Sequence, residues 1–199
     1  MTDIAEQPPQ SHTTARTLAA DVRVPERIEL GETGFHLRRL IPDDARAVHD
    51  AIVAGFTEIH RWMPWCTEPV ELEDQRQFVE RSIADWERAS AFNLGVFDAE
   101  GRLGGMVSLM DRIDPGGLET GYWLRTDVTG RGVITAAVRA LTDIALALPG
   151  VTHVEVHCDA ANVRSAAVPR RLGFRLAREV PREIEAPAES GTEQHWVTP

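Results

Sequence analysis

The stretch from residue 118 to residue 158 constrains the fold of this chain more than any other part of its sequence. A run suited to a strand, 118–124, leads into a turn with two glycines, Gly130 and Gly132. Beyond the turn, apolar residues recur at helical spacing from 134 to 148, and the β-branched run 151–158 then suits a central strand. This order predicts one strand–helix–strand crossover within a sheet.

The segments on either side of the crossover predict a mixed α/β layout. Strands are expected within 27–40, 91–97 and 102–110, and the last two are separated by a hairpin signal. Helical patterns follow residues 42–44 and begin again near residue 71. After the crossover we expect a short helix at 163–172 and terminal strands within 174–184 and 193–198. An antiparallel meander therefore feeds the crossover.

Composition is that of one compact globular domain. The chain has 199 residues, of which 43% are hydrophobic and 26% charged. No apolar run approaches the roughly 18 residues that a membrane-spanning helix needs, and the N-terminus lacks the apolar core of a signal peptide. Cys66 and Cys158 lie far apart, in no metal or disulfide spacing. We therefore expect reduced thiols and a cytoplasmic protein, with a mobile tail at 1–23 and a single domain at 24–199.

Charge argues against two classes of partner. The formal net charge is −10, and all 21 basic residues are arginine. Such acidity disfavours nucleic acid and anionic membrane as main partners, and it suits a cationic substrate such as an amine. Residues 129–175 nevertheless hold six arginines against three acidic residues. We therefore expect an anion-binding face within an acidic protein.

The glycine turn is the candidate for that face. Glycine lets backbone approach a bulky anion, and the first N–H groups of a helix have no partner within it. The helix dipole adds partial positive charge there, so a strand, a glycine turn and a helix start together suit a phosphate. Arg131 would add charge at the mouth. On this turn alone, a helix start whose glycines only make a turn remains open. Two nucleotide motifs are excluded, because the chain has no lysine for a P-loop and no Gly-x-Gly-x-x-Gly after the strand.

A second segment, Asn162–Phe174, directly follows the strand at 151–158. It contains Asn162, Ser165 three residues later and the pair Gly173-Phe174. Together with residues 129–137, it resembles the Gcn5-related N-acetyltransferase (GNAT) superfamily, and within it the RimJ/RimL branch of ribosomal-protein alanine N-acetyltransferases. The resemblance extends from about residue 28 to residue 197 and includes the segments 37–40, 62–65 and 121–124.

The resemblance implies a fold and an activity. The fold is α/β, with a central mixed, mostly antiparallel twisted sheet of about seven strands and about four flanking helices. The activity is the transfer of an acetyl or other short acyl group from acyl-CoA to a primary amine, by direct attack on the thioester. The acceptor would be a protein N-terminus or a small cationic amine, and a homodimer is possible. The alternative, of a different class, is a catalytically silent module that binds acyl-CoA.

The resemblance also implies the residues that hold acetyl-CoA or coenzyme A. The family loop wraps the pyrophosphate, and a strand and a second helix hold the rest of the cofactor. On this chain the contacts would be Trp123, Leu124, Thr129, Gly130, Arg131, Gly132, Val133, Ile134, Thr135, Asn162 and Arg164. For Asn162 a helix cap, and for Arg164 a solvated helix face, are the alternatives.

The chain departs from the family pattern at three positions. Thr129 stands in place of Gln or Arg, and Ile134 in place of the second Gly or Ala. Pro169 stands where many relatives have a tyrosine that acts as general acid. Since the loop works largely through backbone amides, the first two changes need not abolish binding. The third removes that acid.

Candidate catalytic residues follow from what amide formation requires: a neutral amine and a proton for the departing thiolate. Glu119 is the first candidate for general base, with His157 and Glu155 as alternatives; a structural ion pair is the competing role of Glu119. Ser165 is the candidate to protonate the thiolate, unless it only bonds backbone at the helix start. His153, Glu155 and His157 alternate on one strand face, but no metal is expected, because the family chemistry needs none.

Aromatic residues are the candidates for acceptor binding. Trp62 and Trp65, with Trp86, are expected to shape an acceptor cleft; the alternative is packing, which tryptophan serves more often.

Overall fold

The computed structural model describes residues 17–199, which form one eight-stranded sheet with four α-helices. The strands lie in the order β1-β2-β3-β4-β5-β6-β8-β7, and only β5 and β6 are parallel. Their bounds are β1 Arg27–Glu29, β2 Phe35–Arg39, β3 Ala91–Asp98, β4 Leu103–Met110, β5 Gly117–Leu124, β6 His153–Asp159, β7 Arg175–Pro181 and β8 Thr192–Val197. The α/β fold with a mostly antiparallel sheet is thus confirmed. One strand more is present than expected, because 27–40 supplies two separate strands.

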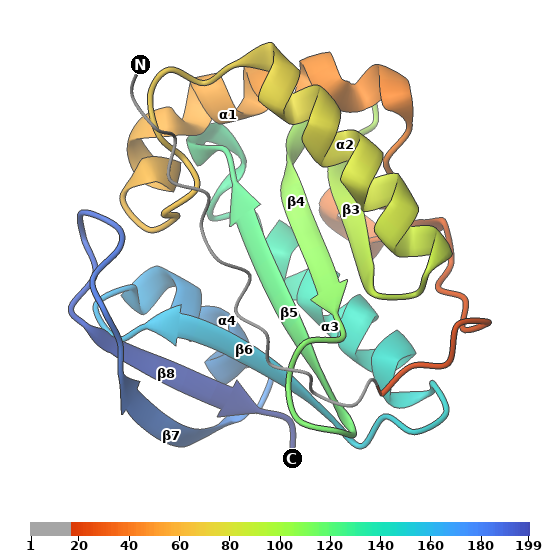
Figure 1. Ribbon diagram of the computed structural model, residues 1–199, viewed down its shortest axis with the longest axis vertical. Helices are drawn as coiled ribbons and strands as arrows, with labels where there is room; N and C mark the ends of the chain where they lie inside the picture. The colour runs from red at the N-terminus through yellow and green to blue at the C-terminus, as the bar shows by residue number, and fades with distance from the viewer. Residues whose placement is uncertain (1–16) are drawn as a thin grey trace, which may run out of the picture.

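The helices divide between the two faces of the sheet (Figure 1). α1 (Ala45–His60) and α2 (Leu72–Glu87) pack on one face, against β3 and β4. α3 (Val133–Leu146) and α4 (Val163–Arg171) pack on the other, and α3 contacts β4, β5 and β6. α3 is the crossover between the two parallel strands that the sequence predicts. Among the described residues, no helix has the length and apolar character that a bilayer crossing requires.

Two apolar clusters hold these layers together. One joins α3 and α4 to the sheet, with Val138, Leu141 and Leu118 fully buried. The other joins α1 and α2 to the sheet around Val48 and Met106. Because burial of one such side chain contributes about 1.5–3 kcal/mol, the two clusters together fix β5 and the head of α3 in place.

β4 approaches β5 closely at a single glycine. Gly105 has φ +157°, and a Cβ there would lie 2.3 Å from the carbonyl oxygen of Trp123. β3 and β4 shift register beside it, between Val96 and Phe97. A side chain at Gly105 would therefore push β4 away from the part of β5 that lines the candidate site.

The folded part begins earlier than residue 24. Residues 17–23 were expected in a mobile tail, but Leu18 and Val22 are buried in the α3-side cluster. The backbone N–H groups of Thr17 and Leu18 both donate to the carboxylate of Asp111, at 3.0 and 2.9 Å. The expectation of a mobile segment at 17–23 is therefore corrected. Two apolar side chains within this mostly polar segment anchor it to the core. The rest of the expected tail, residues 1–16, lies outside the described residues.

Candidate functional site

β5 and β6 pair over only three residues and then diverge. Gly117, Leu118 and Glu119 of β5 pair with residues 153–155 of β6, and the recorded pairing ends there. Figure 1 shows the two strands spreading apart beyond this point. In the described structure, the edge of β5 from residue 120 to residue 124 has no β6 partner, so it can offer backbone N–H and C=O groups to a ligand. Trp123 and Leu124, expected to contact the cofactor, lie on this edge.

The head of α3 carries free backbone amides. No side chain caps this helix, and no N–H group from Gly130 to Thr135 donates a hydrogen bond within the described residues. Gly130 and Gly132 have φ +76° and +75°, with open space where a Cβ would stand. Glycine is needed there for the positive φ, and turns of this kind can bring successive N–H groups together into an anion-binding concavity. Such a concavity, with the helix dipole behind it, attracts a phosphate.

Side chains around this turn leave those amides uncovered. Val133 and Ile134 are buried in the core below the turn, so the unusual Ile134 serves packing. The Thr129 hydroxyl donates to the carbonyl of Thr126 at 2.7 Å. The Arg131 guanidinium lies over the Phe35 ring at 4.8 Å, exposed at the mouth of the turn.

The start of α4 lies on the β6 side of the opening. The side-chain oxygen of Asn162 accepts from the Ser165 N–H at 3.1 Å, so Asn162 caps this helix. Arg164 is largely exposed, and its guanidinium lies 3.5 Å from the Glu58 carboxylate of α1. Both alternatives named from the sequence, cap and solvated arginine, are compatible with these positions.

Tyr122 is a site residue that the sequence reasoning missed. It is the only tyrosine of the chain, and its hydroxyl donates to the Ser165 carbonyl at 2.9 Å. The Ser165 hydroxyl in turn donates to the Tyr122 hydroxyl at 3.2 Å. Burial raises the pKa of Tyr122, so the phenol stays protonated and can donate. Strand alternation could have found it, since it faces α4 while Glu119 faces the opposite side.

Pro169 explains why Tyr122 is held there. In an α-helix the Ser165 carbonyl would accept from the N–H of residue 169, but proline has none. The Tyr122 hydroxyl supplies the missing donor. Pro169 thus leaves free the carbonyl acceptor that orients Tyr122 toward α4.

The buried Glu119 forms an ion pair with the exposed Arg112 on the opposite face of the sheet. Its two carboxylate oxygens accept from Arg112 Nε and Nη2, at 2.8 and 2.6 Å. Burial would raise its pKa, but the hydrogen bonds and charge of Arg112, with smaller effects of His157 and His195, lower it below 4.5. Glu119 therefore forms the ion pair that the sequence analysis named as its alternative role. As a lone base this carboxylate would be weak.

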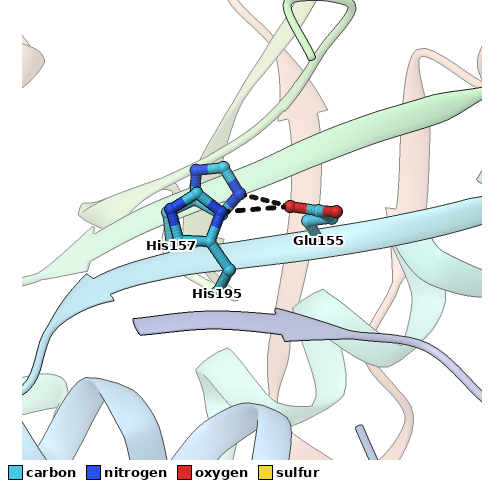
Figure 2. Close-up of side chains that lie close together, drawn as sticks. All are labelled: Glu155, His157 and His195. Atoms are coloured by element: carbon cyan, nitrogen blue, oxygen red, sulfur yellow. Dashed lines mark hydrogen bonds and ion pairs between the residues drawn. The ribbon is translucent and has the colours of Figure 1, made fainter. Parts of the chain in front are cut away.

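Beside Glu119 lies a chain of imidazoles and carboxylates on β6 and β8 (Figure 2). His157 Nε2 lies 2.6 Å from Glu155 Oε2, and its Nδ1 lies 3.7 Å from Glu119 Oε2. The rings of His157 and His195 have centroids 3.7 Å apart. Glu155 is buried, yet its pKa is lowered, because the hydrogen bond and charge of His157 outweigh burial. The sequence analysis named only the residues of β6, because local sequence does not show that β8 pairs with β6 and brings His195 beside His157.

The tryptophans occupy three different environments. Trp65 is half exposed and tilts against Trp123, with ring centroids 6.4 Å apart. Trp62 is half-buried beside Arg61. Trp86 is buried edge-on against Phe92, at 5.0 Å, so little of its ring can reach a ligand. Trp65 alone combines exposure with contact to β5.

A cleft of about 330 Å³ lies between the α1–α2 connection and the β7–β8 connection. It is lined by His60, Met63, Pro64, Thr67, Ile184, Glu185, Ala186 and Pro187. The N–H of Ala188 donates to the carbonyl of Arg61 at 3.0 Å and ties the two connections together. This cleft is not foreseeable from sequence, since its walls lie more than 100 residues apart.

Comparison with known proteins identifies relatives. Residues 35–175 match the family model described as an acetyltransferase (GNAT) domain. A Bacillus subtilis (strain 168) protein named "Putative ribosomal N-acetyltransferase YdaF" is 31% identical over 143 residues, which cover 69% of this chain and 76% of the relative.

Solved structures share the fold at lower identity. RimL, a ribosomal L7/L12 α-N-protein acetyltransferase in complex with coenzyme A, has a TM-score of 0.79 at 20% identity, covering 87% of this chain and 97% of its own. The microcin C7 self-immunity acetyltransferase MccE, in complex with acetyl-CoA and AMP, has a TM-score of 0.78 at 21% identity, covering 88% and 97%.

The Tyr122–Ser165–Pro169 arrangement predicts a coupling between two substitutions. Tyr122→Phe should destabilise the protein by about 1 kcal/mol or more, because the Ser165 carbonyl loses its donor. In a Pro169→Ala background the same substitution should cost less, since residue 169 then offers an N–H. Urea unfolding of the four proteins in the double-mutant cycle measures this coupling. Equal costs of Tyr122→Phe in both backgrounds would contradict the assignment.

The Glu119–Arg112 pair predicts a pH-dependent effect. Since the folded-state pKa of Glu119 is lowered, its stabilising contribution is present above the unfolded carboxyl pKa near 4.5 and is lost as pH falls through the folded value. Arg112→Gln leaves a buried carboxylate without its partner and should cost about 1–3 kcal/mol at pH 7. The difference from wild type should shrink between pH 7 and pH 4, because Glu119 of the variant, buried without Arg112, protonates at a higher pH than Glu119 of the wild type. Denaturant unfolding across this range checks it, and a pH-independent difference would refute it.

Proposed function

The chain belongs to the GNAT acetyltransferase family, an acyl-CoA-dependent enzyme family, and on this premise we propose that it transfers an acetyl group from acetyl-CoA to the α-amine of a protein N-terminus. The observation that carries the proposal is the opening between β5 and β6, with the free amides of α3 at one end. The names of the relatives, a ribosomal N-acetyltransferase and RimL, favour a protein acceptor.

The co-substrate would bind along the opening. The backbone N–H groups from Gly130 to Thr135 would hold the diphosphate, with Arg131 at the mouth. The unpaired edge of β5 at Trp123 and Leu124 would bond the amides of the pantetheine arm as a further strand does. Asn162 and Arg164 stand at the start of α4, where the arm would pass.

The reaction requires one proton to leave the amine and one to reach the thiolate. The amine nitrogen attacks the thioester carbonyl carbon, and the bond from that carbon to sulfur breaks. His157 would accept the amine proton, and the carboxylates of Glu119 and Glu155 beside it would stabilise the resulting imidazolium. This assignment gives Glu119 an indirect role, because Arg112 already occupies both of its oxygens.

The departing thiolate would meet the Tyr122–Ser165 pair. The Ser165 hydroxyl, which donates to the Tyr122 hydroxyl in the structure, would turn to donate a hydrogen bond to the departing sulfur. Tyr122 would stay protonated and keep its hydrogen bond to the Ser165 carbonyl. Coenzyme A would leave as a thiolate stabilised by this hydrogen bond and take its proton from solvent.

Because a histidine is a weak base, the reaction favours an acceptor amine that is already partly deprotonated at the working pH. A peptide α-amine has a pKa of about 8, whereas a lysine side chain has about 10.4. At pH 7.5 an appreciable fraction of the α-amine already has its lone pair free. The acceptor would lie by Trp65 and the cleft lined by Met63, Ile184 and Glu185.

The test is a panel of amines, including N-terminal peptides, lysine side chains and small amines, with acetyl-CoA and succinyl-CoA as competing donors. We expect thiol release with acetyl-CoA and N-terminal peptides, and a higher kcat/KM than for lysine side chains. His157→Gln should lower kcat by about 10²-fold at pH 7 with unchanged CoA affinity, while His36→Gln on distant β2 serves as the matched control.

Calorimetry with coenzyme A separates this proposal from the silent module. CoA binding without turnover on any amine would favour the silent module and overturn the transferase proposal. A His157→Gln variant with wild-type kcat would overturn only the role given to this histidine.

A further inference from the structure

We propose that Glu155, His157 and His195 form a three-ligand site for a divalent transition-metal ion, with Zn²⁺ as the best match. The donor atoms would be Glu155 Oε2, His157 Nε2 and His195 Nδ1. A ligand atom from each of the three residues lies within 4.8 Å of the others. Figure 2 shows both imidazoles turned toward the same carboxylate.

The sheet itself sets this geometry. His157 of β6 and His195 of β8 are register partners, so their side chains emerge side by side on one face. Glu155 precedes His157 by two residues and therefore shares that face. Glu155 Oε2 lies 2.6 Å from His157 Nε2 and 3.5 Å from His195 Nδ1. Ligand atoms of a tetrahedral zinc lie about 3.3 Å apart, given bonds of about 2.0–2.1 Å. All three donor atoms lie within 4.8 Å of one another, so bringing each pair to about 3.3 Å changes no distance by more than about 1.5 Å.

His195 supplies an independent observation. Its side chain is 9% exposed, and its Nδ1 has no hydrogen-bond partner within the described residues. A buried, unsatisfied ring nitrogen is costly to leave without a partner. This nitrogen points at the Glu155 carboxylate, at the position where a shared cation would satisfy it.

The ring nitrogen of each histidine that would not bind the metal lies near a carboxylate. His195 Nε2 lies 2.9 Å from Glu193 Oε2, and His157 Nδ1 lies 3.7 Å from Glu119 Oε2. Metal-binding histidines commonly donate their second ring N–H to a carboxylate, which fixes the tautomer and aims the other lone pair at the metal. Glu193 holds His195 in that tautomer, with Nδ1 free to coordinate.

The ligand types select the metal. Two imidazoles and one carboxylate suit Zn²⁺, Co²⁺ or Ni²⁺ and offer too few oxygens for Ca²⁺ or Mg²⁺. Three protein ligands leave a fourth position for water. One cation opposes binding: Arg178 Nη2 lies 3.5 Å from Glu155 Oε2, on a side chain that is 48% exposed and can turn outward.

The site stands apart from the proposed function, because metal binding needs neither coenzyme A nor an acceptor. Where both hold, an ion on His157 Nε2 would remove its lone pair, and Zn²⁺ would inhibit transfer reversibly. Failure of that inhibition alone would count against the role of His157 in catalysis, whereas failure of binding would count against the metal site.

The experiment uses the full chain without an affinity tag, freed of metal by a chelator and titrated with Zn²⁺ in a calorimeter. We expect one Zn²⁺ per chain, and visible absorption bands of a tetrahedral site when Co²⁺ replaces it. Glu193→Gln should weaken binding by about 10- to 100-fold, and His195→Gln should abolish it. Arg178→Gln should tighten it, because the competing cation is gone. His36→Gln, four strands away from β6, is the matched control and should bind as wild type does.

Two results would overturn the proposal. One is absence of Zn²⁺ binding by the wild-type chain; the other is equal binding by wild type, His195→Gln and Glu193→Gln. Circular dichroism establishes that each variant is folded, and if His195→Gln is not, the opposite shifts expected for Glu193→Gln and Arg178→Gln decide the question.

Discussion

The short pairing of β5 with β6 is the constraint on which the rest of the structure depends. Three residue pairs join the strands, which then diverge, and α3 connects them in the chain while packing against both. Divergence frees one backbone edge of β5, aims the head of α3 at the opening and brings Tyr122 to the start of α4. Apolar packing of α3 beneath both strands holds the two strands in this arrangement. The candidate cofactor site is therefore made chiefly of backbone, so the side chains of Thr129 and Ile134 would matter little for binding.

The two faces of the opening carry different kinds of polar group. On the α4 face, hydroxyl groups lie in an apolar setting, where burial keeps Tyr122 protonated. On the other face, carboxylates and imidazoles lie close together, and ion pairs hold the pKa values of Glu119 and Glu155 down. Burial also lowers the pKa of His195, with help from His157 and Arg178, and so favours its neutral form. In the proposed reaction, the hydroxyl groups of one face would serve the departing sulfur and the imidazole of the other would accept the amine proton, as acyl transfer to an amine requires.

Much of this fold could be predicted from local pattern. Helical spacing located α1, α2 and α3, and the glycine turn before Val133 marked the candidate phosphate site, because both signals lie within a few residues. Long-range pairing was beyond such reasoning. Nothing near His157 indicates that His195 will lie beside it, and Tyr122 acquires its role only because Pro169, 47 positions later, leaves a carbonyl free. The apolar residues Leu18 and Val22 were likewise too sparse to reveal that this polar stretch is anchored.

The central claim is that the backbone amides from Gly130 to Thr135 hold the diphosphate of coenzyme A. The most direct measurement follows the amide signals of the ¹⁵N-labelled protein by NMR during titration with coenzyme A, and separately with inorganic pyrophosphate. The account predicts that signals of residues 130–135 move in both titrations, while those of α2 stay in place. Unmoved signals at 130–135, with coenzyme A shifting a different set of residues, would contradict it.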